Sequence, residues 1–372
     1  MVTLLHQRYN STALSFVSNF ERIGLAQDIV HTSLRSAGDP GETISVSSPD
    51  QSTDSSQDLC SETKCAKLQL KEEQYRSRHT GSCYQASCYE VVADPNEIHT
   101  ILTGPGDSFP IICPRLDLDN SSQRIDLTTY RSGLRYVAIS HVWSDGLGNV
   151  CRNAIPSCQL YRLSRLAYEV SGQDLGSAYF WLDTICVPPD QARDDEAQQA
   201  ALSRMRISYE AAEIVMVLDS WLQTQRMRSC PDSEVLLKIL TSLWNTRLWT
   251  LQEGALGKRL FFEFSDGFYD ADAGLQKLHG EADFLVSFLL KPVIFQRFED
   301  FRGVRKYHRS IDQIIALSHG LQSRSTSVAA DEPLCLGTML GLDVDKGLQH
   351  HWYPALECQL LHQCRLLLLN AA

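Results

Sequence analysis

Four short apolar runs alternate with segments of helical spacing between residues 136 and 264, and this alternation constrains the fold more than any other feature. The runs are YVAIS (136–140), FWLDTI (180–185), EIVMVLD (213–219) and LFFEF (260–264). Compact runs of β-branched and aromatic residues between polar loops are typical of strands buried on both faces. Strands that alternate with helices usually form a parallel sheet with helices on its faces. The sequence therefore predicts an α/β protein built on a parallel sheet.

Apolar residues recur at helical spacing in the segments that join these strands. Residues 202–212 follow this spacing between the second and third strands. Residues 235–243 and 249–256 do so between the third and fourth strands, and Gly257 ends the second of these segments. A period near 3.6 residues is typical of helices with one buried face, so we expect three helices here.

The flanking parts of the chain predict a division into four regions. Residues 1–42 carry a weak helical pattern, and residues 43–58 form a Ser- and Asp-rich tract that cannot build a core and is predicted to be a linker. Residues 80–265 are predicted to form the main domain. Residues 266–372 are predicted to be a mainly helical C-terminal region, which could be truncated, with its clearest apolar segment at 284–290.

The charge of the chain disfavours two classes of partner. The net charge is −11 and no run of basic residues stands out, so the chain would repel nucleic acid and anionic membranes. No apolar segment approaches the ~20 residues needed to span a bilayer, and the first residues lack the pattern of a secretory signal. The 12 cysteines are therefore interpreted as mostly reduced thiols of a cytoplasmic protein.

Polar side chains follow the predicted strands at their carboxyl ends, where open α/β sheets bind ligands. Ser140, His141, Trp143 and Asp145 follow the first strand, and Asp183 follows the apolar part of the second. Each has a structural explanation by itself, because a histidine can bond a nearby backbone group and an aspartate can cap a turn. Together they predict a binding site at one edge of the sheet.

A cysteine nucleophile is one alternative at this edge. Cys186 has His141 and Asp183 as candidates for its base and for the group that orients the base. No nucleophile signature surrounds Cys186, however, and its apolar neighbours are typical of a buried, inert thiol.

A metal site is another alternative, nearer the N-terminus. Cys60-x4-Cys65 and Cys83-x4-Cys88, with His79 between the pairs, have the residue types of zinc ligands. Both spacings are wider than the commonest zinc knuckle, and one pair borders the linker. The sequence therefore leaves zinc binding open, and no metal ligand is assigned.

Three blocks of the chain carry a family resemblance. They are YVAISHVWSDGLGN (136–149), FWLDTICVPPDQ (180–191) and RLWTLQEGAL (247–256). In this order and spacing they resemble the fungal heterokaryon-incompatibility (HET) domain, over about residues 130–260. Two departures are Pro188-Pro189-Asp190, where the family usually has an Asn-Gln-containing turn, and His141, where many members carry Tyr.

The resemblance implies a role in fungal nonself recognition and programmed cell death, and a flavodoxin-like sheet distantly similar to that of Toll/interleukin receptor (TIR) domains. In TIR enzymes a glutamate serves the cleavage of the nicotinamide–ribose bond of NAD, and the corresponding residue here is Glu253. The resemblance thus implies Glu253 as the catalytic residue, NAD as the substrate and no cofactor. The substrate-binding residues would be Ser140, His141, Trp143, Asp145, Asp183 and Trp249.

A module that signals by self-association, without chemistry, is the alternative function, because TIR-like domains do both and a fold does not decide between them. An incompatibility partner protein is implied in either case, but the sequence does not identify it. Trp249 and Glu253 are four residues apart and share a helix face, which packing alone would also explain. In that explanation Glu253 pairs with Arg247 or Lys258.

Overall fold

The computed structural model describes residues 75–84, 88–115, 123–149, 151–189, 195–280, 290–306, 311–321, 324 and 331–340. The chain divides into two compact units, Met1–Leu59 and Cys60–Ala372, and all described residues belong to the second unit. The predicted helical segment at 1–42, the predicted linker at 43–58 and nearly all of the apolar segment at 284–290 lie outside the described residues.

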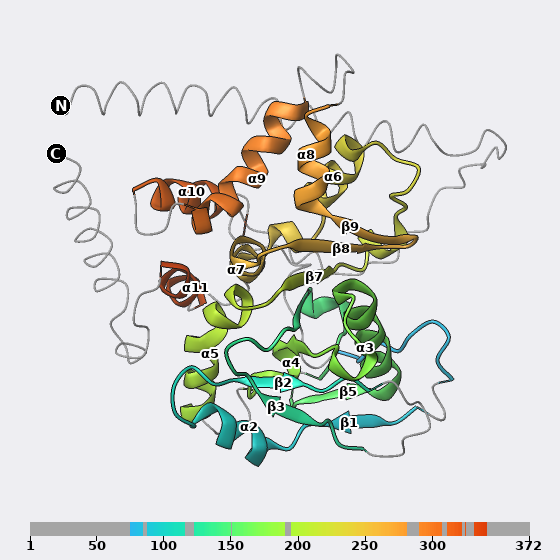
Figure 1. The fold of residues 1–372 in the computed structure, drawn as a ribbon, viewed down its shortest axis with the longest axis vertical. Coiled ribbons are helices and arrows are strands. Elements are labelled where there is room, and N and C mark those ends of the chain that lie inside the picture. The colour runs from blue at the N-terminus through green and yellow to red at the C-terminus, as the bar shows by residue number, and fades with distance from the viewer. Residues whose placement is uncertain are drawn as a thin grey trace, which may run out of the picture. The chain divides into compact units, whose positions relative to one another are not determined.

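A mixed sheet of seven strands forms the centre of the second unit (Figure 1), in the order β3-β2-β6-β4-β7-β8-β9. Its strands are β2 (Pro110–Ile112), β3 (Leu127–Thr129), β4 (Val137–His141), β6 (Phe180–Leu182), β7 (Ile214–Leu218), β8 (Leu260–Phe264) and β9 (Gly267–Asp270). The four inner strands β6, β4, β7 and β8 are parallel, whereas β2, β3 and β9 pair antiparallel with their neighbours. A separate antiparallel pair joins β1 (Glu90–Val92) to β5 (Ala154–Pro156).

The central strands are apolar because they are covered on both faces. Every residue of β4 and β7 is buried, and the two strands are in register from Val137 opposite Ile214 to His141 opposite Leu218. Ile139 of β4 also lies opposite Leu182 of β6. This register brings the carboxyl ends of β4, β6 and β7 to the same edge of the sheet.

Ten helices are found in the described residues. They are α2 (Pro95–Leu102), α3 (Ser157–Ser171), α4 (Asp183–Cys186), α5 (Asp195–Glu210), α6 (Asp232–Thr241), α7 (Leu248–Leu256), α8 (Ala271–Leu278), α9 (Lys291–Lys306), α10 (Ile311–Leu321) and α11 (Asp331–Leu340). Helix α7 packs against α5, α9, α10 and α11, and Figure 1 shows it between α9 and α11. This packing buries all but one residue of α7. None of the helices described is long and apolar enough to cross a membrane.

The predicted α/β architecture is confirmed, with four corrections. The three predicted helices correspond to α5, α6 and α7, and each begins before its apolar pattern does. The second predicted strand ends at Leu182, because the following residues form the short helix α4, in which the carboxylate of Asp183 accepts the amide N–H of Thr184. The sheet is mixed rather than wholly parallel, and the C-terminal region begins with β9, not with a helix.

Candidate functional site

Glu253 lies inside the protein, where it contacts the carboxyl end of β4. It is 5% exposed, and its Oε2 accepts a hydrogen bond from the hydroxyl of Ser140, the fourth residue of β4. The indole N–H of Trp244 donates to the same hydroxyl oxygen at 2.6 Å. Trp244 is fully buried and begins the short helical turn η8 (Trp244–Thr246) between α6 and α7. A donor chain from indole to hydroxyl to carboxyl group thus connects η8, β4 and α7.

The buried position of Glu253 raises the pKa of its carboxyl group. Burial raises its pKa, the hydrogen bond from Ser140 lowers it, and the charge of Asp183 raises it. The net result is a pKa of about 7. The charges of His141 and Arg247 act in the opposite direction to Asp183. Glu253 therefore changes its charge state near neutral pH, as general acids and bases of enzymes often do.

His141, Asp183 and Trp143 form a second group beside the first. Nε2 of His141 lies 2.9 Å from Oδ1 of Asp183 and 3.2 Å from Oγ1 of Thr184. The indole N–H of Trp143 donates to Oδ2 of Asp183 at 2.8 Å. The rings of His141 and Trp143 stack with their centroids 5.8 Å apart. Both oxygens of Asp183 thus accept hydrogen bonds from residues at the end of β4.

His141 and Asp183 stabilise each other's charged forms. Burial disfavours the charged imidazole, but the charge of Asp183 and its hydrogen bond outweigh burial and raise the pKa of His141. Burial likewise opposes ionisation of Asp183, and the charge of His141 with the hydrogen bonds to Asp183 holds its pKa below the usual value. Within the described residues, the buried Nδ1 of His141 has no hydrogen-bond partner. A buried polar atom of this kind needs an explanation, and a ligand is one.

A loop and an N-terminal strap cover this group. The loop consists of residues 146–148. Gly148 has a φ of +94°, and a Cβ atom added to it would lie 2.1 Å from Cγ2 of Thr184. Only glycine allows the loop to pack this closely on Thr184. The strap consists of residues 75–84, and the hydroxyls of Tyr75 and Ser77 donate to the carbonyl of Gly148. The negative charge of Asp183 contributes, after burial, to a raised pKa of Tyr75.

The structure places the remaining predicted residues apart from this network. Asp145 lies at the end of the same edge but accepts hydrogen bonds from the amide and the hydroxyl of Ser220, both at 2.8 Å. Trp249 is partly buried against the core. The tryptophan that reaches Ser140, and through it Glu253, is Trp244, which the sequence analysis did not single out.

Two further charged residues, one buried and one partly buried, stabilise the segments around the site. Asp219, directly after β7, accepts the backbone N–H groups of Trp221, Leu222 and Trp244. Burial raises its pKa despite these bonds. Its position directly after a strand marks it as a candidate in the sequence, but no local pattern predicts that it fixes the start of η8.

Arg324 donates to the carbonyl of Arg247, to the hydroxyl of Thr250 and to the side-chain oxygen of Asn245. Burial lowers its pKa to about 9. Arg324 lies at least 74 positions from these partners in the chain, so local sequence patterns do not predict the contact.

The environment of Cys186 does not favour a nucleophilic thiolate. Cys186 is 1% exposed, and burial raises its pKa well above the ordinary value for a thiol. A thiolate is the nucleophilic form, and apolar burial suppresses it.

Potential metal ligands gather elsewhere, at His79, Cys83, Cys88 and Cys158. Cys60 and Cys65, the other candidates from the sequence, lie outside the described residues.

Comparison with known proteins adds one finding. No curated protein and no solved structure matches this chain. Residues 136–232 match the family model described as heterokaryon incompatibility protein (HET). The matched region runs from the residue before β4 to the first residue of α6, so it contains Ser140, His141 and Asp183 but ends before Glu253. The part of the chain that builds the carboxyl ends of β4, β6 and β7 is therefore similar to the heterokaryon-incompatibility family.

Proposed function

We propose that this protein acts in fungal nonself recognition and cell death by hydrolysing the nicotinamide–ribose bond of NAD, with Glu253 as the catalytic carboxylate. The observation that carries the proposal is the buried Glu253, bonded to Ser140 and adjacent in the fold to the His141–Asp183 pair. The similarity of residues 136–232 to the heterokaryon-incompatibility family supports the biological context.

The strand order supports a TIR-like, flavodoxin-like sheet. Numbered along the chain, the parallel strands β4, β6, β7 and β8 have the spatial order 2-1-3-4. Flavodoxin-like sheets begin with the same order, and their ligands bind where the order reverses, beyond the carboxyl ends of the first and third strands. In this chain that point lies between Ser140 of β4 and Asp219 after β7.

The reaction needs little more than one carboxylate and a water molecule. The bond between C1′ of ribose and the nicotinamide nitrogen breaks, and its electron pair leaves with nicotinamide, which is neutral and needs no general acid. Positive charge develops on the ribose ring, and a nearby carboxylate stabilises it, as in glycoside hydrolysis. Water adds to C1′ and loses a proton, for which Glu253 with its pKa of about 7 is a suitable acceptor. The products are nicotinamide, ADP-ribose and a proton.

The His141–Asp183 pair would orient the substrate. The unpartnered Nδ1 of His141 faces away from the Nε2 atom that bonds Asp183 and can bond a hydroxyl or carbonyl group of a ligand. Asp183 is 16% exposed through its side chain, and Trp143 is partly buried, so this side of the network is the one that solvent reaches.

The test is NAD consumption by the purified full-length protein, alone and fused to an oligomerisation domain. The wild type should release nicotinamide and ADP-ribose, and Glu253→Gln should lower the rate at least ~100-fold, as loss of a preorganised transition-state contact does. Glu169→Gln makes the same chemical change at a more exposed helix position and should leave the rate unchanged. A Glu253→Gln protein that is folded by circular dichroism and still consumes NAD at the wild-type rate would refute the role of Glu253.

A self-association module without chemistry is the second candidate. The observation that favours it is that Glu253 and Ser140 are both buried and hydrogen-bonded to each other. A buried polar network of this kind can specify the core without any catalytic role. Absence of NAD turnover in the fused wild type, together with concentration-dependent oligomers of the unfused protein in light scattering, would favour this candidate. In both cases we propose a cytoplasmic protein that acts with a second copy or with an incompatibility partner protein.

A further inference from the structure

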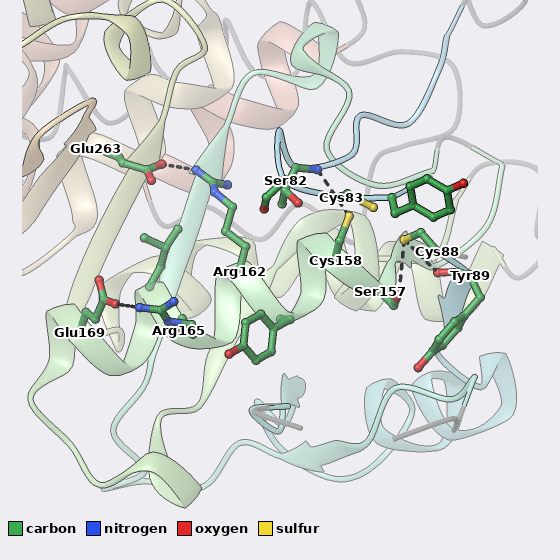
Figure 2. Close-up of a pocket in the computed structure, with 14 residues that line it drawn as sticks. Ser82, Cys83, Cys88, Tyr89, Ser157, Cys158, Arg162, Arg165, Glu169 and Glu263 are labelled. Carbon is green, nitrogen blue, oxygen red and sulfur yellow. Dashed lines mark hydrogen bonds and ion pairs between the residues drawn. The ribbon is translucent and has the colours of Figure 1, made fainter. Parts of the chain in front are cut away.

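Four side chains of types that can bind a metal gather beside α3, and three of them line one end of a hollow. The Nδ1 atom of His79 and the Sγ atoms of Cys83, Cys88 and Cys158 all lie within 4.8 Å of one another. Figure 2 shows the three sulfur atoms at the end of the hollow near Tyr89, with Arg162 and Arg165 farther along α3. All four side chains are partly buried.

Backbone pairing brings Cys88 and Cys158, which are far apart in the chain, close to each other in space. Glu90 of β1 lies opposite Pro156 of β5. Cys88 is two residues before Glu90, and Cys158 is two residues after Pro156, in the first turn of α3. The amide of Ser157 donates to the carbonyl of Tyr89 at 2.9 Å, one residue beyond the paired strands. The backbone pairing therefore brings the segments that carry Cys88 and Cys158 side by side.

Two distances between the ligand atoms agree with tetrahedral coordination of zinc. With Zn–S bonds of about 2.3 Å and Zn–N bonds of about 2.0–2.1 Å, neighbouring nitrogen and sulfur ligands of a tetrahedral site lie roughly 3.5–3.6 Å apart. Nδ1 of His79 lies 3.5 Å from Sγ of Cys83 and 3.6 Å from Sγ of Cys158. Both of these nitrogen–sulfur distances therefore match the edge of such a tetrahedron.

The surroundings of two of the sulfur atoms would stabilise thiolates that bind a metal. The amide N–H of Thr80 points at Sγ of Cys158 at 3.4 Å, and Oγ of Ser157 lies 3.3 Å from Sγ of Cys88. Cys158 is the second residue of the 15-residue helix α3, where the helix dipole stabilises negative charge. Hydrogen bonds of this kind orient the ligands of metal sites and stabilise their charge.

We propose that His79, Cys83, Cys88 and Cys158 bind one Zn²⁺ ion in a closed, tetrahedral structural site. Three thiolates and one imidazole are a ligand set typical of structural zinc, and four protein ligands leave no position for a substrate. The inference is independent of the proposed NAD hydrolysis.

Such a site would fasten the N-terminal strap onto the sheet. His79 and Cys83 belong to the strap, whereas Cys158 belongs to α3. The amide of Arg78 donates to the carbonyl of Gly146 at 2.7 Å, and the side chain of Gln159 donates to the carbonyl of Arg78 at 3.0 Å. Zinc would therefore hold the strap over the loop 146–148, which in turn packs on Thr184 beside Asp183.

Metal analysis of the full-length protein, purified under reducing conditions from zinc-supplemented cells, tests the proposal directly. We expect about one zinc ion per chain in the wild type, and loss of that zinc in Cys158→Ser and His79→Ala. Cys151→Ser removes an exposed cysteine outside the cluster and should retain the full amount. Equal zinc content in Cys158→Ser and the wild type would overturn the proposal.

Cobalt substitution of the wild type keeps the test valid if these variants do not fold. Replacement of zinc by Co²⁺ should produce the intense visible bands of tetrahedral cobalt and a thiolate-to-cobalt charge-transfer band in the near ultraviolet. Chelation of the metal should lower the unfolding temperature, because binding to the folded state alone stabilises it. A wild-type protein that takes up neither metal, or whose Cys83, Cys88 and Cys158 are found in a disulfide by mass spectrometry, would refute the site.

Discussion

Glu253 combines the burial of a core residue with the chemistry of a titrating one. Its carboxyl group accepts a hydrogen bond from Ser140, yet burial still raises its pKa to about 7. The ordinary value for a glutamate is 4.5. At a pH between these two values, Glu253 is therefore protonated in the folded protein but ionised in the unfolded chain.

This difference predicts a pH-dependent loss of stability that Glu253→Gln removes. Between the unfolded pKa and the folded pKa, the unfolded chain binds fewer protons than the folded protein does. The free energy of unfolding therefore falls by up to about 1.4 kcal/mol for each unit by which the pH rises. Between about pH 5 and about pH 8, the stability of the wild type should fall relative to Glu253→Gln by roughly 2–3 kcal/mol. Urea unfolding of both proteins across this range measures the difference, and shared effects of other groups cancel.

A constant difference between the two proteins would contradict the raised pKa. Glu169→Gln provides the comparison, because Glu169 is 40% exposed through its side chain. Its difference from the wild type should change little with pH in the same range, since an exposed ion pair contributes only about 0–1 kcal/mol.

Single residues also show where sequence reasoning succeeds and where it fails. Ser140, His141 and Asp183 were singled out as polar residues at the ends of predicted strands, and Glu253 was singled out through the family resemblance. Trp244 was not, because the tryptophan at helical spacing from Glu253 is Trp249. The turn η8 decides which indole reaches Ser140, and Asp219, far away in the chain, fixes that turn.

At the scale of elements, the apolar strands of the parallel core were predictable and the short strands outside it were not. The apolar runs at 213–219 and 260–264 become β7 and β8. All residues of β7 are buried, and alternate residues of β8 are buried, so both strands need apolar residues. The strands β1, β2, β3 and β5 have only three residues each, too few for a periodic signal. The pairing of β1 with β5 is what places Cys158 beside Cys88, so the same limitation hid the fourth potential metal ligand.

The contact between α7 and η8 makes a prediction about Gly254. A Cβ at this position would lie 2.8 Å from Cη2 of Trp244, an indole held by its hydrogen bond to Ser140 and by an edge contact with Phe262. Alanine favours a helix over glycine by about 1 kcal/mol, but overpacking of a rigid core costs about 1–3 kcal/mol. Gly254→Ala should therefore lower the free energy of unfolding by about 1 kcal/mol, measured by urea unfolding.

Gly176→Ala is the matched control for this prediction. A Cβ at Gly176 would meet no atom of the described chain within 4 Å, and the residue has no positive φ. Its stability should stay equal to that of the wild type or rise by a few tenths of a kcal/mol. An increase in stability for Gly254→Ala of the same size would show that Trp244 moves freely and that the turn is not rigid.

At the scale of the whole described unit, the region similar to the heterokaryon-incompatibility family is only part of a larger core. Residues 136–232 contain β4, β6 and β7, but β6 also pairs with β2 and β7 with β8. Helix α7 with Glu253 lies beyond this region and is covered by α9, α10 and α11. The carboxylate and the strand ends therefore meet only when both parts are present.

We expect that residues 136–232 do not fold alone, whereas residues 75–340 do. The shorter fragment would expose the unpaired edges of two apolar strands, which favours aggregation. Thermal unfolding followed by circular dichroism should show a cooperative transition only for the longer fragment. A cooperative transition of residues 136–232 with dispersed amide resonances would contradict this expectation.

The strand order also has a consequence for the folding of the chain during synthesis. Strand β4 lies at the centre of the sheet, yet it is made before both of its neighbours, β6 and β7, and β8 follows later still. A ribosome that has just released β4 must add about 40 residues before the first parallel partner exists, which takes seconds at ordinary rates of elongation. Throughout this interval β4, whose residues are all buried in the folded protein, has no partner on either edge. Chaperones that bind extended apolar segments should therefore engage the nascent chain at residues 137–141.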